Sequence, residues 1–157
     1  MKQNEDHIMT SHYFEAGRPL LAKLPHGGDL IPTLERFSTA EKIQTAVFYM
    51  IGALSCVTLG HYDQKLQVYV TAKKEEPLEI AHCTGNITLK DESPTIHMHA
   101  ILSSQDGSVY AGHIFSETII FAGEIYIQPL LGAPLEREYD KNTGLFLWKG
   151  EIPWQKR

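Results

Sequence analysis

Residues 93–115, SPTIHMHAILSSQDGSVYAGHIF, predict a β-hairpin and, with it, a strand-rich fold. Both halves are rich in Val, Ile, Tyr and Thr, which favour strands, and the dipeptide Asp106-Gly107 between them is typical of a tight turn. Alternate side chains of a strand point to the same face. His97 and His99 therefore share one face, and Met98 points the other way, into the core.

A third histidine, His113, lies on the second half of this hairpin. Pairing around the turn places it opposite residues 99 and 100, about 4.5–5.5 Å from a neighbour on the same face. A shift of one residue would turn it to the other face.

Three imidazoles on one face can hold a divalent metal ion, with zinc the expected one, at about 2.0–2.1 Å each. They leave a fourth position for water, substrate or a carboxylate. Nickel, cobalt and iron accept the same ligands. The alternative is a surface HxH pair without metal, since the chain has eight histidines.

Other residues are candidates for a fourth ligand or for a hydrogen-bonding partner of the ligands: Glu124, Glu79 and His82. Their positions depend on the order of strands in the sheet.

The serines at 103 and 104 lie near His99 and Asp106, but no nucleophile-elbow pattern surrounds them, which argues against a serine hydrolase.

Strand-like segments separated by Gly, Asp, Asn or Pro follow one another through most of the chain. They predict a strand-rich α+β domain with largely antiparallel pairing. Gly52 and Gly60 interrupt the longest segment, which indicates a bulge or a bend in the sheet.

The helical signals lie between residues 25 and 44. Asp29 is the expected N-cap of a helix with Pro32 in its first turn, and Ser38 or Thr39 is the expected cap of a second short helix.

The size of the chain, 157 residues and 17.7 kDa, suits one domain. We expect a flexible N-terminal lead-in over 1–13, a single domain over 14–150 and a C-terminal tail over 151–157. No apolar run approaches the roughly 18 residues of a membrane span, and the first residues lack the apolar core of a signal peptide. A cytoplasmic location is therefore expected.

The formal net charge is −5, which argues against strong direct binding of nucleic acid. Gly17-Arg18-Pro19 matches the core of an AT-hook, but its neighbours, Glu15, Ala16, Leu20 and Leu21, supply none of the flanking basic residues that grip phosphates. Direct DNA binding is expected to be weak or absent.

Five segments together resemble the plants-and-prokaryotes-conserved (PPC) domain family. They are GGDLIPTL (27–34), IGALSCVTLGHYD (51–63), EIAHCTGNIT (79–88), HMHAILSSQDGSVYAGHI (97–114) and REYDKNTGL (137–145). The resemblance implies a curved antiparallel sheet with one main helix, assembled as a homotrimer. Bacterial members are often described as predicted DNA-binding proteins, although the DNA contact of the plant members comes from an AT-hook.

The chain is also similar in fold to the acetolactate decarboxylases, which hold zinc with an HxH pair and a third histidine. His97, His99 and His113 match that arrangement in type and order.

Two functions follow from these resemblances. One is a trimeric regulatory or DNA-associated binding module with protein partners, and the alternative is a zinc-dependent lyase or hydrolase acting on a small carbonyl or carboxylate substrate. A closed four-ligand site would favour the first, and an open, solvent-filled pocket with a nearby acid or base the second.

Overall fold

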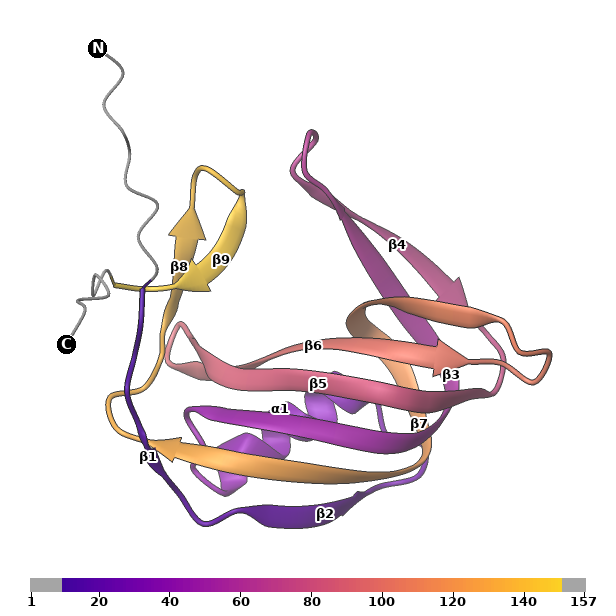
Figure 1. The fold of residues 1–157 in the computed structure, drawn as a ribbon, viewed down its shortest axis with the longest axis horizontal. Coiled ribbons are helices and arrows are strands. Elements are labelled where there is room, and N and C mark those ends of the chain that lie inside the picture. Colours follow the sequence, from indigo (N-terminus) through magenta and orange to yellow (C-terminus); the bar gives the residue numbers. More distant parts are fainter. Residues whose placement is uncertain (1–9, 151–157) are drawn as a thin grey trace.

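The computed structural model describes residues 10–150, which form a strongly curved main β-sheet, a small two-stranded β-sheet and a single helix (Figure 1). The predicted tail over 151–157 lies outside the described residues, as does most of the predicted lead-in over 1–13. The elements in chain order are β1 (Glu15–Ala16), β2 (Leu20–Leu24), α1 (Leu30–Ala40), β3 (Ala46–Asp63), β4 (Val68–Lys74), β5 (Leu78–Lys90), β6 (Ser93–Ser103), β7 (Val109–Leu131), β8 (Arg137–Asp140) and β9 (Leu145–Trp148).

All the strand pairs in these elements are antiparallel. The main sheet has the order β1-β7-β6-β5-β3-β4, with β2 also paired to β7. An additional pairing of β3 with β7 joins the two sides of this sheet, so that β7, β6, β5 and β3 form a closed circuit. The α+β fold with a mostly antiparallel sheet and one main helix is confirmed.

The alternation of buried and exposed side chains along β6 shows which face of the sheet points into the core. Met98 and Leu102 are buried, whereas His99 between them is exposed. Helix α1 covers the concave face of the sheet with Leu30 and Leu34, which are both buried in the same core. The histidines therefore lie on the face that α1 does not cover.

Strand β7 is a single bent strand. The bend lies at Glu117, whose φ is 64°, and Asp29 holds it in place. The Asp29 carboxylate accepts hydrogen bonds from the backbone N–H of Glu117 at 2.8 Å and of Thr118 at 3.4 Å. Asp29 does occupy the N-cap position of α1, but its side chain makes no capping hydrogen bond. The carboxylate that the sequence assigns to the helix instead shapes the strand that carries His113.

The predicted second helix is wrong, because α1 continues without a break to Ala40. The two hydroxyl residues expected to cap a new helix lie inside this one. Ser38 donates to the carbonyl oxygen of Leu34 at 2.7 Å, and Thr39 donates to that of Glu35 at 2.9 Å. A hydroxyl that bonds the carbonyl one turn earlier is a pattern of residues inside a helix, so neither residue begins a new one.

The bulge predicted at Gly52 is confirmed. The register of β3 against β5 shifts between Met50 and Gly52, and Gly52 has a φ of 139°, which side chains disfavour. A Cβ at this position would overlap the backbone of Ala122 on β7. Among residues 10–150, no helix is long and apolar enough to cross a membrane.

Candidate metal centre

Three histidines meet on the face of the sheet opposite the core. His97 and His99 lie on β6, and the register of β6 against β7 pairs His99 directly with His113. The three ring centroids are 5.1–5.3 Å apart, and one ring nitrogen from each lies within 4.8 Å of the others. Within the described part of the chain, no other group of three histidine, cysteine or carboxylate side chains is close enough to share a metal ion.

Aromatic rings from β4 and from β7 itself pack against His113. Its ring centroid lies 5.0 Å from that of Tyr69 and 4.7 Å from that of Phe115. Gly60 pairs with His113 across the ladder of β3 and β7, and a Cβ there would overlap the Phe115 ring. A glycine on β3 thus leaves the room in which Phe115 packs against the histidine.

Two of the three imidazoles are held in their neutral form. Burial, the nearby Arg137 guanidinium and His99 together lower the pKa of His97 from 6.5 to about 4. Burial, with smaller effects of His97, His99 and Arg137, lowers the pKa of His113 to about 4 as well. A neutral imidazole has a lone pair available for a cation, so these two rings need not release a proton at pH 7 to bind a metal ion.

One ring nitrogen of the cluster has no partner among the described residues. Nδ1 of His113 is buried and makes no hydrogen bond. A buried polar atom without a partner is unfavourable, and a bound metal ion or water would supply one. Neutral imidazoles with an unpaired nitrogen fit a divalent transition metal, since imidazole suits zinc, copper, iron and nickel.

A fourth group at this site, Arg137 of β8, was not among the site residues predicted from the sequence. Its Nε donates to Thr88 Oγ1 at 2.8 Å, and its terminal nitrogens donate to Asn86 Oδ1 and to the Phe146 carbonyl oxygen, both at 2.9 Å. One terminal nitrogen also lies 3.5 Å from Nδ1 of His97. The approach of β8 to β5 creates these contacts, and no spacing around residue 137 signals it.

The candidate fourth ligands do not join the three histidines. His82 lies on β5 opposite Ile101, two residues further along β6 than His99. Glu79 lies further still in the same direction, opposite Ser103. Glu124 belongs to the half of β7 beyond the bend, where it pairs with β2 and β3. The described residues therefore bring together a set of three imidazoles without a carboxylate.

A cavity of about 460 Å³ opens beside the histidines. His97, His113 and Arg137 all line it, so two of the three histidines and the guanidinium face the same space. The remaining lining is largely aromatic and aliphatic and contains no aspartate or glutamate. It consists of Tyr62, Gln67, Val68, Tyr69, Lys90, Thr95, Ile96, Phe115, Gly144, Leu145, Phe146 and Leu147.

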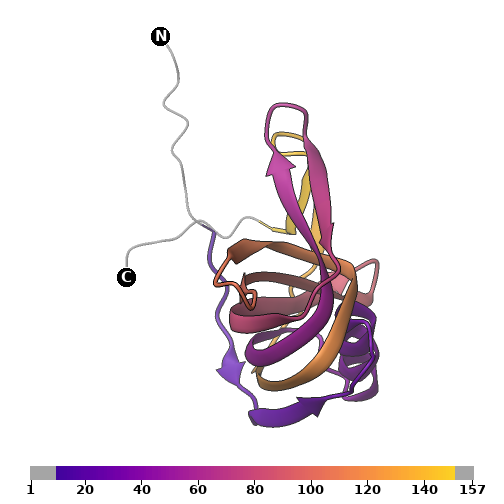
Figure 2. The same cartoon turned by 90° about the vertical axis from the view of Figure 1, so that its right-hand side faces the viewer.

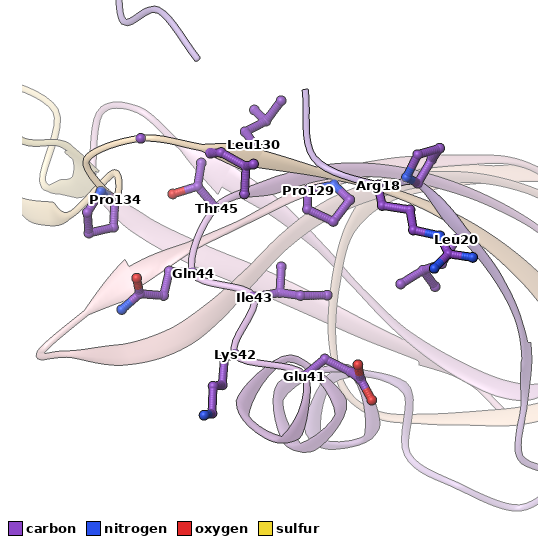
Figure 3. Close-up of a pocket in the computed structure, with 13 residues that line it drawn as sticks. Arg18, Leu20, Glu41, Lys42, Ile43, Gln44, Thr45, Pro129, Leu130 and Pro134 are labelled. Carbon is purple, nitrogen blue, oxygen red and sulfur yellow. The ribbon is translucent and has the colours of Figure 1, made fainter. Parts of the chain in front are cut away.

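A separate cavity of about 640 Å³ lies where the chain enters β2, near the ends of α1 and β7. Figure 3 shows its charged side chains, Arg18, Glu41 and Lys42. It has no histidine or cysteine in its lining and so offers no comparable ligand set. The adjoining Gly17 donates its N–H to the Pro129 carbonyl oxygen at 2.8 Å, which fixes the Gly17-Arg18-Pro19 segment against the end of β7.

Comparison with known families identifies the domain. The sequence profile of the Plants and Prokaryotes Conserved (PCC) domain matches residues 11–131. The chain belongs to this family, the PPC family named above. A comparison with curated proteins finds no match.

Three solved structures resemble most of the described fold. A metal-containing protein from Archaeoglobus fulgidus is 41% identical, with a TM-score of 0.86 over 90% of this chain and 100% of that one. A plant- and prokaryote-conserved protein from Pyrococcus horikoshii is 31% identical, with a TM-score of 0.85 over 92% and 99% of the two chains. A protein from Ralstonia eutropha, described as a candidate DNA-binding protein, is 26% identical, with a TM-score of 0.73 over 82% and 89%.

Proposed function

We propose that this PPC protein is a metal-dependent binding module that holds one divalent ion, zinc by preference, on His97, His99 and His113. The observation that carries the proposal is the meeting of three ring nitrogens within 4.8 Å of one another. The description of the 41% identical archaeal relative as metal-containing supports it. Bound zinc would keep a fourth position open for an exchangeable ligand.

A role in binding is favoured over catalysis because the cavity lacks an evident general base. None of its lining residues is an aspartate or glutamate. Burial raises the pKa of the Tyr69 phenol above its ordinary value of 10.0, so this group stays protonated at neutral pH. We infer that the module acts in regulation through protein partners, with DNA association, where it occurs, brought about by those partners.

A zinc-dependent lyase or hydrolase is the second candidate, and the open cavity beside the histidines favours it. In such an enzyme, the chain's own contribution would be to bind a small carbonyl or carboxylate compound next to the ion and to orient it. Turnover of such compounds by zinc-loaded protein, lost on removal of zinc, would establish this function in place of a binding role.

We also propose that the protein assembles as a homotrimer. Large apolar side chains are exposed on the outer face of the sheet, on β3 and β7: Val47 (47%), Tyr49 (54%), Ile51 (57%) and Phe121 (56%). An apolar patch of this kind is typical of an interface between subunits. Light scattering is expected to give three times the mass of 17.7 kDa, and Ile51→Lys should shift the protein toward the monomer. A monomeric parent protein at micromolar concentration would contradict the assembly.

Isothermal titration of metal-free protein with zinc tests the metal centre. We expect one ion per chain, and titrations with nickel, cobalt and manganese rank the preference among ions. Failure to bind any of these ions at micromolar concentration would overturn the proposed function.

A further inference from the structure

Two hairpins enclose the cavity beside the histidines. The outer part of β3–β4 and the β8–β9 hairpin rise from the same side of the sheet (Figures 1 and 2). They are joined at their tips, because the Tyr62 hydroxyl donates to the Thr143 carbonyl oxygen at 2.6 Å and the Gln67 amide donates to that of Asn142 at 3.0 Å. We call the space of about 460 Å³ beneath them the hairpin chamber. Its volume lies within the usual range for a small-molecule site.

The polar end of the chamber has an excess of positive charge. The half-buried Arg137 guanidinium donates only to neutral acceptors, and no ion pair of residues 10–150 includes it. Lys90 adds a second cation, with its Nζ 3.6 Å from the centre of the Phe146 ring. A half-buried cation without a counter-charge favours an anion beside it, and a metal ion on the histidines would increase this preference.

Arg137 still has hydrogen-bonding capacity for a ligand. A guanidinium carries five N–H groups, and its protein acceptors take four of them, with Nδ1 of His97 at 3.5 Å as the fourth. The terminal nitrogen that donates to the Phe146 carbonyl oxygen keeps one N–H without an acceptor among the described residues. A charged donor beside a metal site suits a carboxylate oxygen.

The other walls of the chamber are apolar. Tyr69 and Phe115 stand next to His113, and Leu145 and Leu147 of β9 also line the chamber. Rings and aliphatic side chains of this kind bind a flat or branched hydrocarbon body by excluding water from it. A simple inorganic anion would leave these surfaces unused.

We propose that the hairpin chamber binds a small organic carboxylate with an aromatic or branched apolar body, its carboxylate held between the metal ion and Arg137. This inference rests on the proposed metal centre and adds the chemical class of its ligand. Lys90 supplies a second attractive charge, and the rings of Tyr69 and Phe115 contact the apolar body.

Calorimetric titration of zinc-loaded protein with benzoate tests the proposal, with benzamide as a neutral probe of the same shape and acetate as a probe of the head group alone. We expect benzoate to bind at millimolar concentration or below, and benzamide and acetate to bind at least tenfold more weakly. Metal-free protein should also bind benzoate at least tenfold more weakly.

Two variants locate the site, and a third is the matched control. Arg137→Lys keeps the charge but loses the guanidinium N–H available to the ligand, and it should weaken benzoate binding roughly tenfold to a hundredfold, the range for a hydrogen bond to a charged group. Lys90→Met should weaken it several-fold and covers the case in which the Arg137 variant does not fold. Lys149→Met removes an exposed cation that pairs with Glu136 outside the chamber, and it should leave binding unchanged.

The outcomes separate this inference from the proposed function. Zinc uptake without benzoate binding, or equal binding of benzoate and benzamide, overturns the ligand class and leaves the metal centre intact. Equal binding of benzoate to zinc-loaded and metal-free protein overturns the contact with the metal ion. Failure to take up zinc overturns both proposals.

Discussion

Replacing His99 with alanine should abolish the stabilisation of this protein by zinc while leaving the metal-free fold nearly unchanged. His99 is the exposed member of the three histidines, whereas His97 and His113 are half-buried. Substitutions at exposed positions away from special features typically change the free energy of unfolding by less than about 0.5 kcal/mol. The variant therefore isolates metal binding from stability.

The size of the effect follows from linkage between binding and folding. An ion that binds only the folded state, present at about a hundred times its dissociation constant, stabilises by about 2.7 kcal/mol. For a chain of this length, that amounts to a rise in Tm of about 5–10 °C. If the loss of one imidazole weakens binding a hundredfold, the same zinc concentration stabilises by only about 0.4 kcal/mol, which shifts Tm by about 1 °C.

Thermal unfolding followed by circular dichroism, with and without zinc, provides the assay. His82→Ala is the matched control, because His82 is an exposed histidine on the adjacent strand, opposite Ile101, and does not belong to the ligand group. It should keep the full zinc-dependent rise. An unchanged rise in His99→Ala, or its loss in His82→Ala, would refute the assignment of ligands.

Three further results are expected. Metal-free protein should lose stability as the pH falls from about 6.5 toward 4. The pKa of His97 and of His113 is lowered to about 4 in the folded state, so the unfolded chain binds more protons in this range. Chemical unfolding at several pH values checks this, and the free energy of unfolding should depend less on pH in His97→Gln. Asp29→Ala should lower the free energy of unfolding by roughly 1.5–3 kcal/mol, since the N–H groups of Glu117 and Thr118 lose a charged acceptor; an unchanged urea midpoint would show that the bend in β7 does not depend on this carboxylate. With a net charge of −5, the protein should bind duplex DNA with a Kd no tighter than about 10⁻⁶ M at physiological salt and without sequence preference; a nanomolar Kd with a preference for A·T-rich duplexes in fluorescence titration would contradict this.

The sequence contained enough to locate the histidines relative to one another. Alternation around Met98 set the faces of β6, and the turn predicted around Asp106-Gly107 placed His113 opposite residues 99 and 100. The observed connection is the five-residue loop 104–108, and it makes His99 the partner of His113. These are short-range features, in which strand period and turn chemistry act within about twenty residues.

The remaining site residues depended on contacts that no local pattern encodes. Arg137 reaches the site through the pairing of β8 with β9 and through its bonds to β5, fifty residues earlier in the chain. The register of β5 against β6 shifts between Ile80 and His82, so the residue of β6 that lies opposite His82 could not be found by counting along the strand from Ile80. Asp29 likewise satisfies the sequence pattern of a helix cap, yet tertiary structure directs its carboxylate to β7.

X-ray absorption at the zinc edge of protein purified with one equivalent of zinc tests the central claim most directly. We expect a first shell of three imidazole nitrogens at about 2.0–2.1 Å and one further light atom that is exchanged when a carboxylate is added. Sulfur scattering at about 2.3 Å, or fewer than three imidazoles in the shell, would show that His97, His99 and His113 do not hold the ion together.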